Sequence, residues 1–360
     1  MTASTASIAP APMAAVSSRV RTTGLLMAVA SALAFSSSGP LIKPLLEAGW
    51  SVGAALLVRM GVSGLILSAP LLLAITRQPG FLRRHGLLIV GFGLTAVAGC
   101  QIFFFGAMQR MPVAIALLIQ YLAPVLLVGY AWVRTRRAPS RLVIAGTIVA
   151  VTGLVLVVDI AGAKFDLIGT LLALAAAVCV AAYFLISERA GDDLPPLALA
   201  GGGLLVGTAF MGLLLVSGIL PFAAPAVSVP LAGMELPWFV PLLWVAGVAT
   251  TVGYALGVMA VPRVGSRVAS FVGLSEVLFA LGFAWLLLGE APSVVQLLGG
   301  ALILGGVILV RMDAEAVAAV PRRSAAAEAD RSATAEADRS AAAEADRSAA
   351  AATAPAVPAP

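Results

Sequence analysis

Long hydrophobic stretches alternate with short polar segments along most of the chain. A helix rises about 1.5 Å per residue, so about 20 apolar residues cross a hydrocarbon core about 30 Å thick. Ten stretches have about this length, at residues 24–43, 50–76, 86–109, 111–133, 142–158, 167–187, 197–217, 238–261, 268–288 and 292–310. The pattern predicts an all-α membrane protein with ten transmembrane helices in a compact bundle. Pro221, Pro225 and Pro230 predict a loop after the seventh stretch.

Basic residues in the loops predict the orientation, because cytoplasmic loops carry an excess of Lys and Arg. With the N-terminus inside, the outer loops hold three basic residues, Lys43, Arg110 and Lys164. The inner side then holds thirteen: Arg19, Arg21, Arg77, Arg83, Arg84, Arg134, Arg136, Arg137, Arg141, Arg189, Arg263, Arg267 and Arg311. We therefore expect a multi-pass protein of the cytoplasmic membrane with both termini in the cytoplasm.

The composition excludes several other classes of protein. Hydrophobic residues make up 61% of the chain and charged residues 11%, too few to give a soluble domain its polar surface. The net charge of +5 reflects the basic residues of the predicted cytoplasmic loops and does not indicate a nucleic-acid partner. His85 is the sole histidine, and neither lysine lies in a glycine-rich phosphate-binding loop. We expect no cofactor, no metal site and no catalytic residues.

Both ends of the chain differ from the hydrophobic stretches. Residues 1–23 are expected to form a disordered cytoplasmic N-terminus. Ala32-Leu33-Ala34 resembles a signal-peptide cleavage site, but the nine stretches that follow favour an uncleaved first helix. Residues 312–360 contain an Ala-rich octapeptide repeat, recurring from Glu328, Glu336 and Glu344, and are expected to form a low-complexity cytoplasmic tail, with a docking role as the alternative.

A larger internal repeat divides the hydrophobic part in two. Residues 111–159 align with 263–312, so that Gly146 corresponds to Gly299 and Gly153 to Gly306. The two halves are then 24–158 and 167–311, joined by a linker at 159–166. Each half has five predicted spans, an odd number, so the second must lie inverted relative to the first. Secondary transporters often have this architecture, with the substrate site near the membrane midplane between the repeats.

The chain resembles the EamA domain of the drug/metabolite transporter superfamily. The resemblance rests on the five-plus-five spans, on Leu288-Gly289-Glu290 before a glycine-rich last span, and on Ala116-Leu117-Leu118-Ile119-Gln120-Tyr121-Leu122-Ala123-Pro124-Val125. It covers about residues 24–311 and implies a ten-helix carrier that moves small metabolites, often outward. Where the first half should carry the Leu-Gly-Glu equivalent, it has Arg134-Thr135-Arg136-Arg137.

Two ionisable residues lie near the middle of predicted spans. Arg59 is in the second stretch and Glu276 in the ninth. A charge at the centre of a membrane helix costs about 2.5–3.5 kcal/mol on insertion scales, so such residues face a cavity or a partner. Glu276 is a candidate site for a proton or a substrate ammonium, and Arg59 for a carboxylate or phosphate. The alternative is a permanent ion pair between them that only joins two helices.

Four further residues are candidates for substrate binding. Pro124 corresponds to Glu276 in the repeat alignment and interrupts the hydrogen-bond ladder of the fourth span, and non-helical backbone at midplane depth is tolerated where it lines a cavity. Gln120, Tyr121 and Gln101 either bind a polar substrate or hydrogen-bond neighbouring helices. Tyr183 and Tyr254 are interpreted mainly as interfacial or packing residues.

The predicted function is secondary transport by alternating access. The substrate is expected to be a small polar metabolite resembling an amino acid, with export as the direction and proton coupling through Glu276 as one mechanism. A polytopic membrane enzyme acting on lipid-linked substrates is the alternative from another class, and a passive channel is a third. The remaining partners are the lipid bilayer and, for a homodimer in place of a monomer, a second copy of the chain.

Overall fold

A computed structural model describes residues 13–111, 113–136, 138–158, 166–191, 193–289, 291–310 and 312–313. The described residues up to Val310 form one compact unit, and Met312 and Asp313 belong to another. The predicted linker at 159–166 is described only at Asp166, and the predicted tail only at Met312 and Asp313. Glu290 of the Leu-Gly-Glu sequence and Arg137 also lie outside the described residues.

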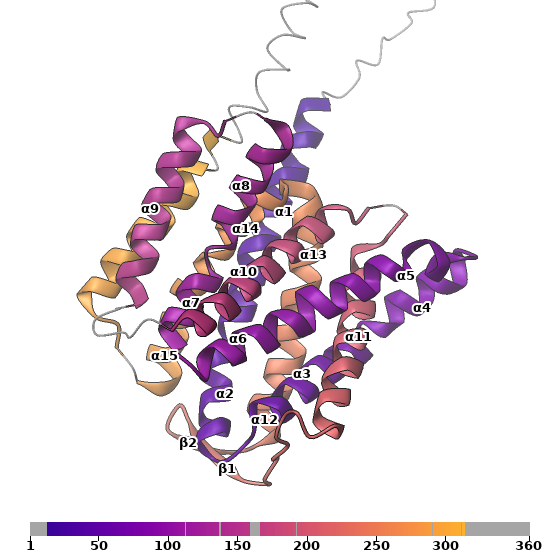
Figure 1. The fold of residues 1–360 in the computed structure, drawn as a ribbon, viewed down its shortest axis with the longest axis vertical. Helices are drawn as coiled ribbons and strands as arrows, with labels where there is room; N and C mark the ends of the chain where they lie inside the picture. Colours follow the sequence, from indigo (N-terminus) through magenta and orange to yellow (C-terminus); the bar gives the residue numbers. More distant parts are fainter. Residues whose placement is uncertain are drawn as a thin grey trace, which may run out of the picture. The chain divides into compact units, whose positions relative to one another are not determined.

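The described chain is predominantly helical, as the hydrophobic pattern predicts (Figure 1). Seven helical segments are long and apolar enough to cross a membrane: Arg19–Glu47, Phe81–Met108, Ala116–Thr135, Leu167–Glu188, Pro196–Val216, Phe239–Val264 and Ser266–Leu288. A pair bent by 42°, Val52–Ile66 with Ser68–Arg77, makes an eighth if it counts as one span. Two apolar helices are shorter, Arg141–Leu156 and Val294–Val310.

Several of these segments consist of more than one helix. The helices of the first half are α1 (Met13–Ser36), α2 (Ser38–Glu47), α3 (Val52–Ile66), α4 (Ser68–Arg77), α5 (Phe81–Phe92), α6 (Cys100–Met108), α7 (Val113–Gln120), α8 (Ala123–Thr135) and α9 (Arg141–Val158). Those of the second half are α10 (Leu167–Glu188), α11 (Pro196–Val216), α12 (Phe239–Trp244), α13 (Gly253–Val264), α14 (Ser266–Gly273) and α15 (Ser275–Leu288), followed by the helix Val294–Val310.

Irregular turns occur at corresponding places in the two halves. A π-helical segment, Gly93–Gly99, joins α5 to α6, and another, Val245–Val252, joins α12 to α13. The fourth segment is interrupted between Gln120 and Ala123, and the ninth between Gly273 and Ser275. Pro124 lies in the first turn of α8, so the interruption falls where the proline predicts it.

Glycines bring several helices into close contact. Gly146 and Gly153 of α9 face Gly306 and Gly299 of the last helix, and Figure 1 shows these two helices side by side. A Cβ atom at Gly153 would lie 2.5 Å from the carbonyl oxygen of Gly299, so only glycine allows the backbones to approach this closely. The helix α1 runs against α13, and α10 against α6.

Two segments differ from the sequence-based expectation. Helix α1 begins at Met13, inside the N-terminal segment that was expected to be disordered, while residues 1–12 lie outside the described part. The segment expected to be a loop contains a hairpin of β1 (Ser228–Leu231) and β2 (Met234–Pro237), paired antiparallel with Leu231 opposite Met234. The hairpin tip bonds to the ninth segment, because the Ala232 N–H donates to the Leu287 carbonyl.

Candidate functional site

A cavity of about 540 Å³ lies among the helices of both halves. Five of the six residues predicted to bind substrate line it: Arg59, Gln101, Gln120, Tyr121 and Glu276. Pro124 is buried and is not among the lining residues, so its contribution is to the backbone of the fourth segment. The structure therefore brings together polar residues from four helical segments of the chain.

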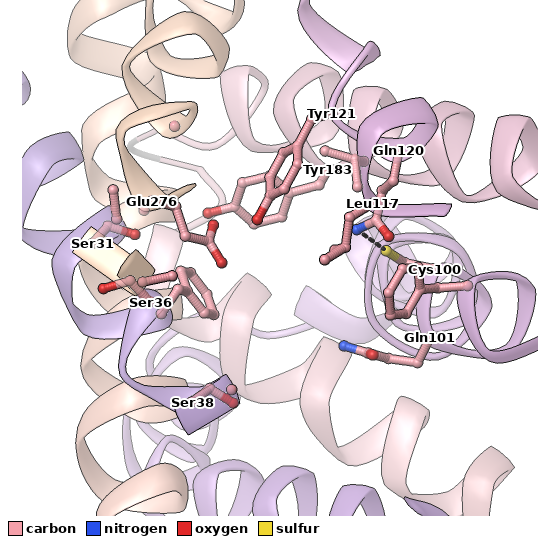
Figure 2. A pocket seen from close by; sticks show the side chains of 18 of the residues that line it. Ser31, Ser36, Ser38, Cys100, Gln101, Leu117, Gln120, Tyr121, Tyr183 and Glu276 are labelled. Atoms are coloured by element: carbon pink, nitrogen blue, oxygen red, sulfur yellow. Dashed lines mark hydrogen bonds between the residues drawn. The ribbon is translucent and has the colours of Figure 1, made fainter. Parts of the chain in front are cut away.

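Glu276 lies at a helix start that faces the cavity. The interruption at Leu274 begins α15 one residue before Glu276, which places this carboxylate in the first turn of the helix. The N-terminal end of a helix carries a partial positive charge, which favours an acidic side chain there. Tyr121, from the interruption between α7 and α8, interacts with the carboxylate as a hydrogen-bond donor. Figure 2 shows the Glu276 carboxylate directed into the cavity beside Tyr121 and Tyr183.

Arg59 reaches the cavity from α3, on the side of α2. Its Nη1 donates to the Ser38 hydroxyl at 3.2 Å, and its Nε is buried without a hydrogen-bond partner. Arg59 and Glu276 interact electrostatically. Among the described residues, however, no ion pair within 4.0 Å joins them. The arrangement thus differs from the permanent ion pair that was the structural alternative, and it leaves both charged groups available to a ligand.

Gln120, Gln101 and Cys100 form the wall opposite Glu276 (Figure 2). The Gln120 Nε2 donates to the Cys100 thiol at 3.6 Å, a weak contact. The Gln120 Oε1 is buried and has no hydrogen-bond partner. An unpaired buried carbonyl costs free energy, so this wall favours a ligand that supplies a donor.

Aromatic rings that the sequence interpretation assigned mainly to packing also line the cavity. Tyr183 and Tyr254 are both lining residues, and their ring centroids are 5.9 Å apart. Phe35 packs edge-to-face on Tyr254 at 5.1 Å. The hydroxyl of Tyr183 lies against α13, where a Cβ at Gly257 would be 2.1 Å from it. A tyrosine in an apolar span is not polar enough for the sequence to predict whether it lines a cavity or packs against other helices.

The two ends of the cavity differ in exposure. At one end it is lined by Lys43 and Glu47 of α2, which are exposed; we call this the open end. At the other end it is lined by Ala28, Val261 and Ala269, which are buried; we call this the closed end. The lining is thus exposed at the end formed by α2 and buried at the end formed by Ala28, Val261 and Ala269.

The sequence matches a family model in two segments, residues 22–159 and 167–312, which is described as the EamA-like transporter family. This chain belongs to the EamA-like transporter family. The match covers both halves of the chain, including every helix that lines the cavity. The family groups the chain with transporters, not with the membrane enzymes considered as the alternative.

Curated relatives of this EamA-like transporter are named as exporters. The threonine/homoserine exporter RhtA of Escherichia coli (strain K12) is 28% identical over 245 residues, covering 65% of this chain and 76% of the relative. A probable terminal-alkyne amino-acid exporter of Streptantibioticus cattleyicolor is 29% identical over 258 residues, covering 69% and 84%. A probable amino-acid metabolite efflux pump of Salmonella typhimurium (strain LT2) is 28% identical over 228 residues, covering 62% and 75%.

The fold is also shared with a solved structure. A crystal structure of a protein whose description states no function matches with a TM-score of 0.63 at 21% identity, over 84% of this chain and 99% of that one. This likeness concerns the fold alone.

Proposed function

We propose that this chain is a secondary exporter that moves amino-acid-like metabolites across the cytoplasmic membrane by alternating access. The observation that carries the proposal is the cavity, which both the Glu276 carboxylate and the Arg59 guanidinium line. An amino acid carries an ammonium and a carboxylate, the charges that Glu276 and Arg59 complement. Three relatives named for amino-acid export support the same substrate class.

We propose ten spans in two inverted repeats. The seven long segments, the bent pair and the two shorter helices account for all ten hydrophobic stretches. The glycine contacts support the inversion, because Gly146 and Gly299 correspond in the repeat alignment, as do Gly153 and Gly306. Gly146 meets Gly306, and Gly153 meets Gly299. Such exchanged contacts arise when a two-fold axis relates antiparallel helices.

The proposed orientation places the closed end of the cavity in the cytoplasm. Arg263 and Arg267 lie near Val261 and Ala269 at that end, and basic residues favour the cytoplasmic side. The structure then corresponds to an outward-open state. In the proposed cycle Glu276 binds either the substrate ammonium or a proton, so that release of one permits binding of the other.

The experiment is flux of L-threonine in proteoliposomes across a range of pH. We expect Glu276→Gln to abolish the pH-dependent part of the flux, because the amide cannot take up a proton, while the protein stays monodisperse in detergent. Glu235→Gln is the matched control, since this carboxylate is exposed in the hairpin, away from the cavity. A Glu276→Gln variant with unchanged flux at every pH would contradict the assigned role. A passive channel would give non-saturable flux in the wild-type protein.

A further inference from the structure

The junction between α1 and α2 presents a helix N-terminus to the cavity. Helix α1 ends at Ser36 and α2 begins at Ser38, and both Ser38 and Gly39 line the cavity. The hydroxyls of Ser36 and Ser37 donate backwards, to the carbonyls of Leu33 and Ala34. These serine hydroxyls therefore bond to carbonyl groups in the last turn of α1. They were not among the site residues predicted from the sequence.

The N-terminus of α2 lacks the groups that normally neutralise such an end. Its N-cap residue, Ser37, makes no capping hydrogen bond with its side chain, and the first turn contains no acidic residue. The Ser37 hydroxyl instead accepts from the Trp244 indole at 3.3 Å. An uncapped helix N-terminus favours an anion, and transporters place such half-helix ends against anionic groups of their substrates.

Arg59 lies beside this N-terminus. Its side chain is partly buried, its Nη1 donates to the Ser38 hydroxyl, and its buried Nε has no hydrogen-bond partner. Within the described part of the chain, no carboxylate lies within ion-pair distance of it. A guanidinium beside a helix N-terminus concentrates positive charge, and both features favour an anionic ligand.

Gly39 leaves room for that ligand. A Cβ atom built on Gly39 would have no heavy atom within 4 Å, although the residue is in a helix and lines the cavity. A ligand oxygen can therefore approach the backbone of the first turn of α2 closely. A side chain at this position would occupy the same space.

We propose that Ser38, Gly39 and Arg59 form a carboxylate subsite that binds the α-carboxylate of an amino-acid substrate. The Arg59 guanidinium and the first turn of α2 bind the carboxylate oxygens, and the Ser38 hydroxyl donates to one of them. Glu276 and Tyr121, which also line the cavity, bind the ammonium of the same molecule. This assignment rests on the proposed export of amino-acid-like metabolites and names the group by which they are selected.

Gly39→Ala tests the subsite with little risk to folding, because the added methyl group enters open space. Gly129→Ala is the matched control, since Gly129 is also helical, also has nothing within 4 Å, and is not among the cavity's lining residues. Equilibrium binding of L-threonine and of its carboxamide, L-threonine amide, is measured on the purified full-length proteins. The amide keeps the ammonium and removes only the carboxylate charge.

We expect the wild-type chain to bind L-threonine at least about tenfold more tightly than the amide, as for the loss of one charge-assisted hydrogen bond. Gly39→Ala and Arg59→Gln should weaken L-threonine binding by about tenfold or more and change binding of the amide little. Gly129→Ala should bind both ligands as the wild type does.

Two outcomes would contradict the proposed subsite, and only the second would also contradict the proposed function. If the wild type binds acid and amide equally, or Gly39→Ala matches Gly129→Ala, the subsite is wrong while amino-acid export stands. If the wild type neither binds nor transports L-threonine or any other amino acid supplied, the proposed function fails and the subsite fails with it.

Discussion

Some contacts in this molecule occur twice, in pairs that the repeat relates, and others occur once. Gly24 of α1 lies against Arg263 and Val264, and Gly169 of α10 lies against Arg110 and Met111 in the same way. The glycine contacts between α9 and the last helix are likewise doubled. Contacts that occur as such related pairs between the halves are expected to persist in every conformation of an inverted repeat, because exchanging the two halves leaves them unchanged.

The contact of Tyr183 with Gly257 occurs once. In the repeat, Gly24 corresponds to Gly169, and Gly146 corresponds to Gly299. With the same differences in residue number, Ser38 corresponds to Tyr183, and Phe104 corresponds to Gly257. Tyr183 contacts Gly257, whereas the position that corresponds to Gly257 holds Phe104, not a glycine. All four residues line the cavity. Doubled contacts therefore build the scaffold, and single contacts determine which end is open.

The largest effect is expected from Gly153→Ala, which breaks a doubled contact. The added Cβ would lie 2.5 Å from the Gly299 carbonyl oxygen and 2.7 Å from the Ile303 nitrogen, both backbone atoms that cannot turn away. Overpacking of this kind costs about 1–3 kcal/mol or more, so we expect a clearly lower melting temperature and a poor yield of folded protein.

Gly305→Ala is the control for that substitution. A Cβ there would meet only the Val149 Cγ1 atom, at 3.9 Å, an ordinary contact. Equal melting temperatures for the Gly153 and Gly305 variants in detergent would show that the seam between α9 and the last helix is not part of the scaffold.

Gly257→Ala breaks the single contact, and we expect it to alter function more than stability. The Cβ would lie 2.1 Å from the Tyr183 hydroxyl oxygen and 2.9 Å from the Ser31 Oγ, so α13 must separate from α10 and α1 at the closed end. The Tyr183 ring cannot simply swing aside, because it packs on Phe92 at 5.7 Å and on Phe184 at 5.0 Å.

The measurement uses the native Cys100 in a Cys179→Ala background, since Cys100 lines the cavity. A membrane-impermeant thiol reagent is added from each side of oriented vesicles. Gly257→Ala should speed labelling from the proposed cytoplasmic side by about tenfold, corresponding to about 1.4 kcal/mol in the open–closed equilibrium. Gly247→Ala, with nothing within 4 Å of its Cβ, should label as the wild type does. Identical labelling of the two variants from both sides would refute the assignment of this contact.

The scaffold was more predictable from sequence than the single contacts were. A membrane span needs about 20 apolar residues, and this requirement places a helical segment at each hydrophobic stretch. Arg59 and Glu276 could be identified by the cost of a charge in an apolar span, and the structure places both in one cavity. The proline at 124 marked an interruption correctly, because its missing N–H breaks the ladder.

The remaining features depend on tertiary contacts that have no local signal. The interruption at Ser37 is the exception, because Pro40 in the first turn of α2 lacks the N–H that would bond to Ser36, a signal that the sequence-based prediction did not use. The strands of the hairpin are four residues long and were interpreted as loop because of Pro225 and Pro230. Whether Tyr183 faces lipid or the cavity depends on the rotation of α10 about its own axis. Because α10 is apolar on all sides, its sequence does not predict this rotation.

The smallest effect is expected from Tyr183→Phe, which separates the contribution of the aromatic ring from that of its hydroxyl. The ring contacts with Tyr254, Phe92 and Phe184 remain, and the contact with Gly257 loses only one oxygen atom. If the aromatic ring holds the closed end together, L-threonine flux in proteoliposomes should change by no more than about threefold, which is less than 1 kcal/mol. Tyr183→Ala removes the ring and should reproduce the increased labelling of Cys100 that we expect for Gly257→Ala. A Tyr183→Phe variant as defective as Tyr183→Ala would assign the closure to the hydroxyl, and the single contact would then be polar instead of steric.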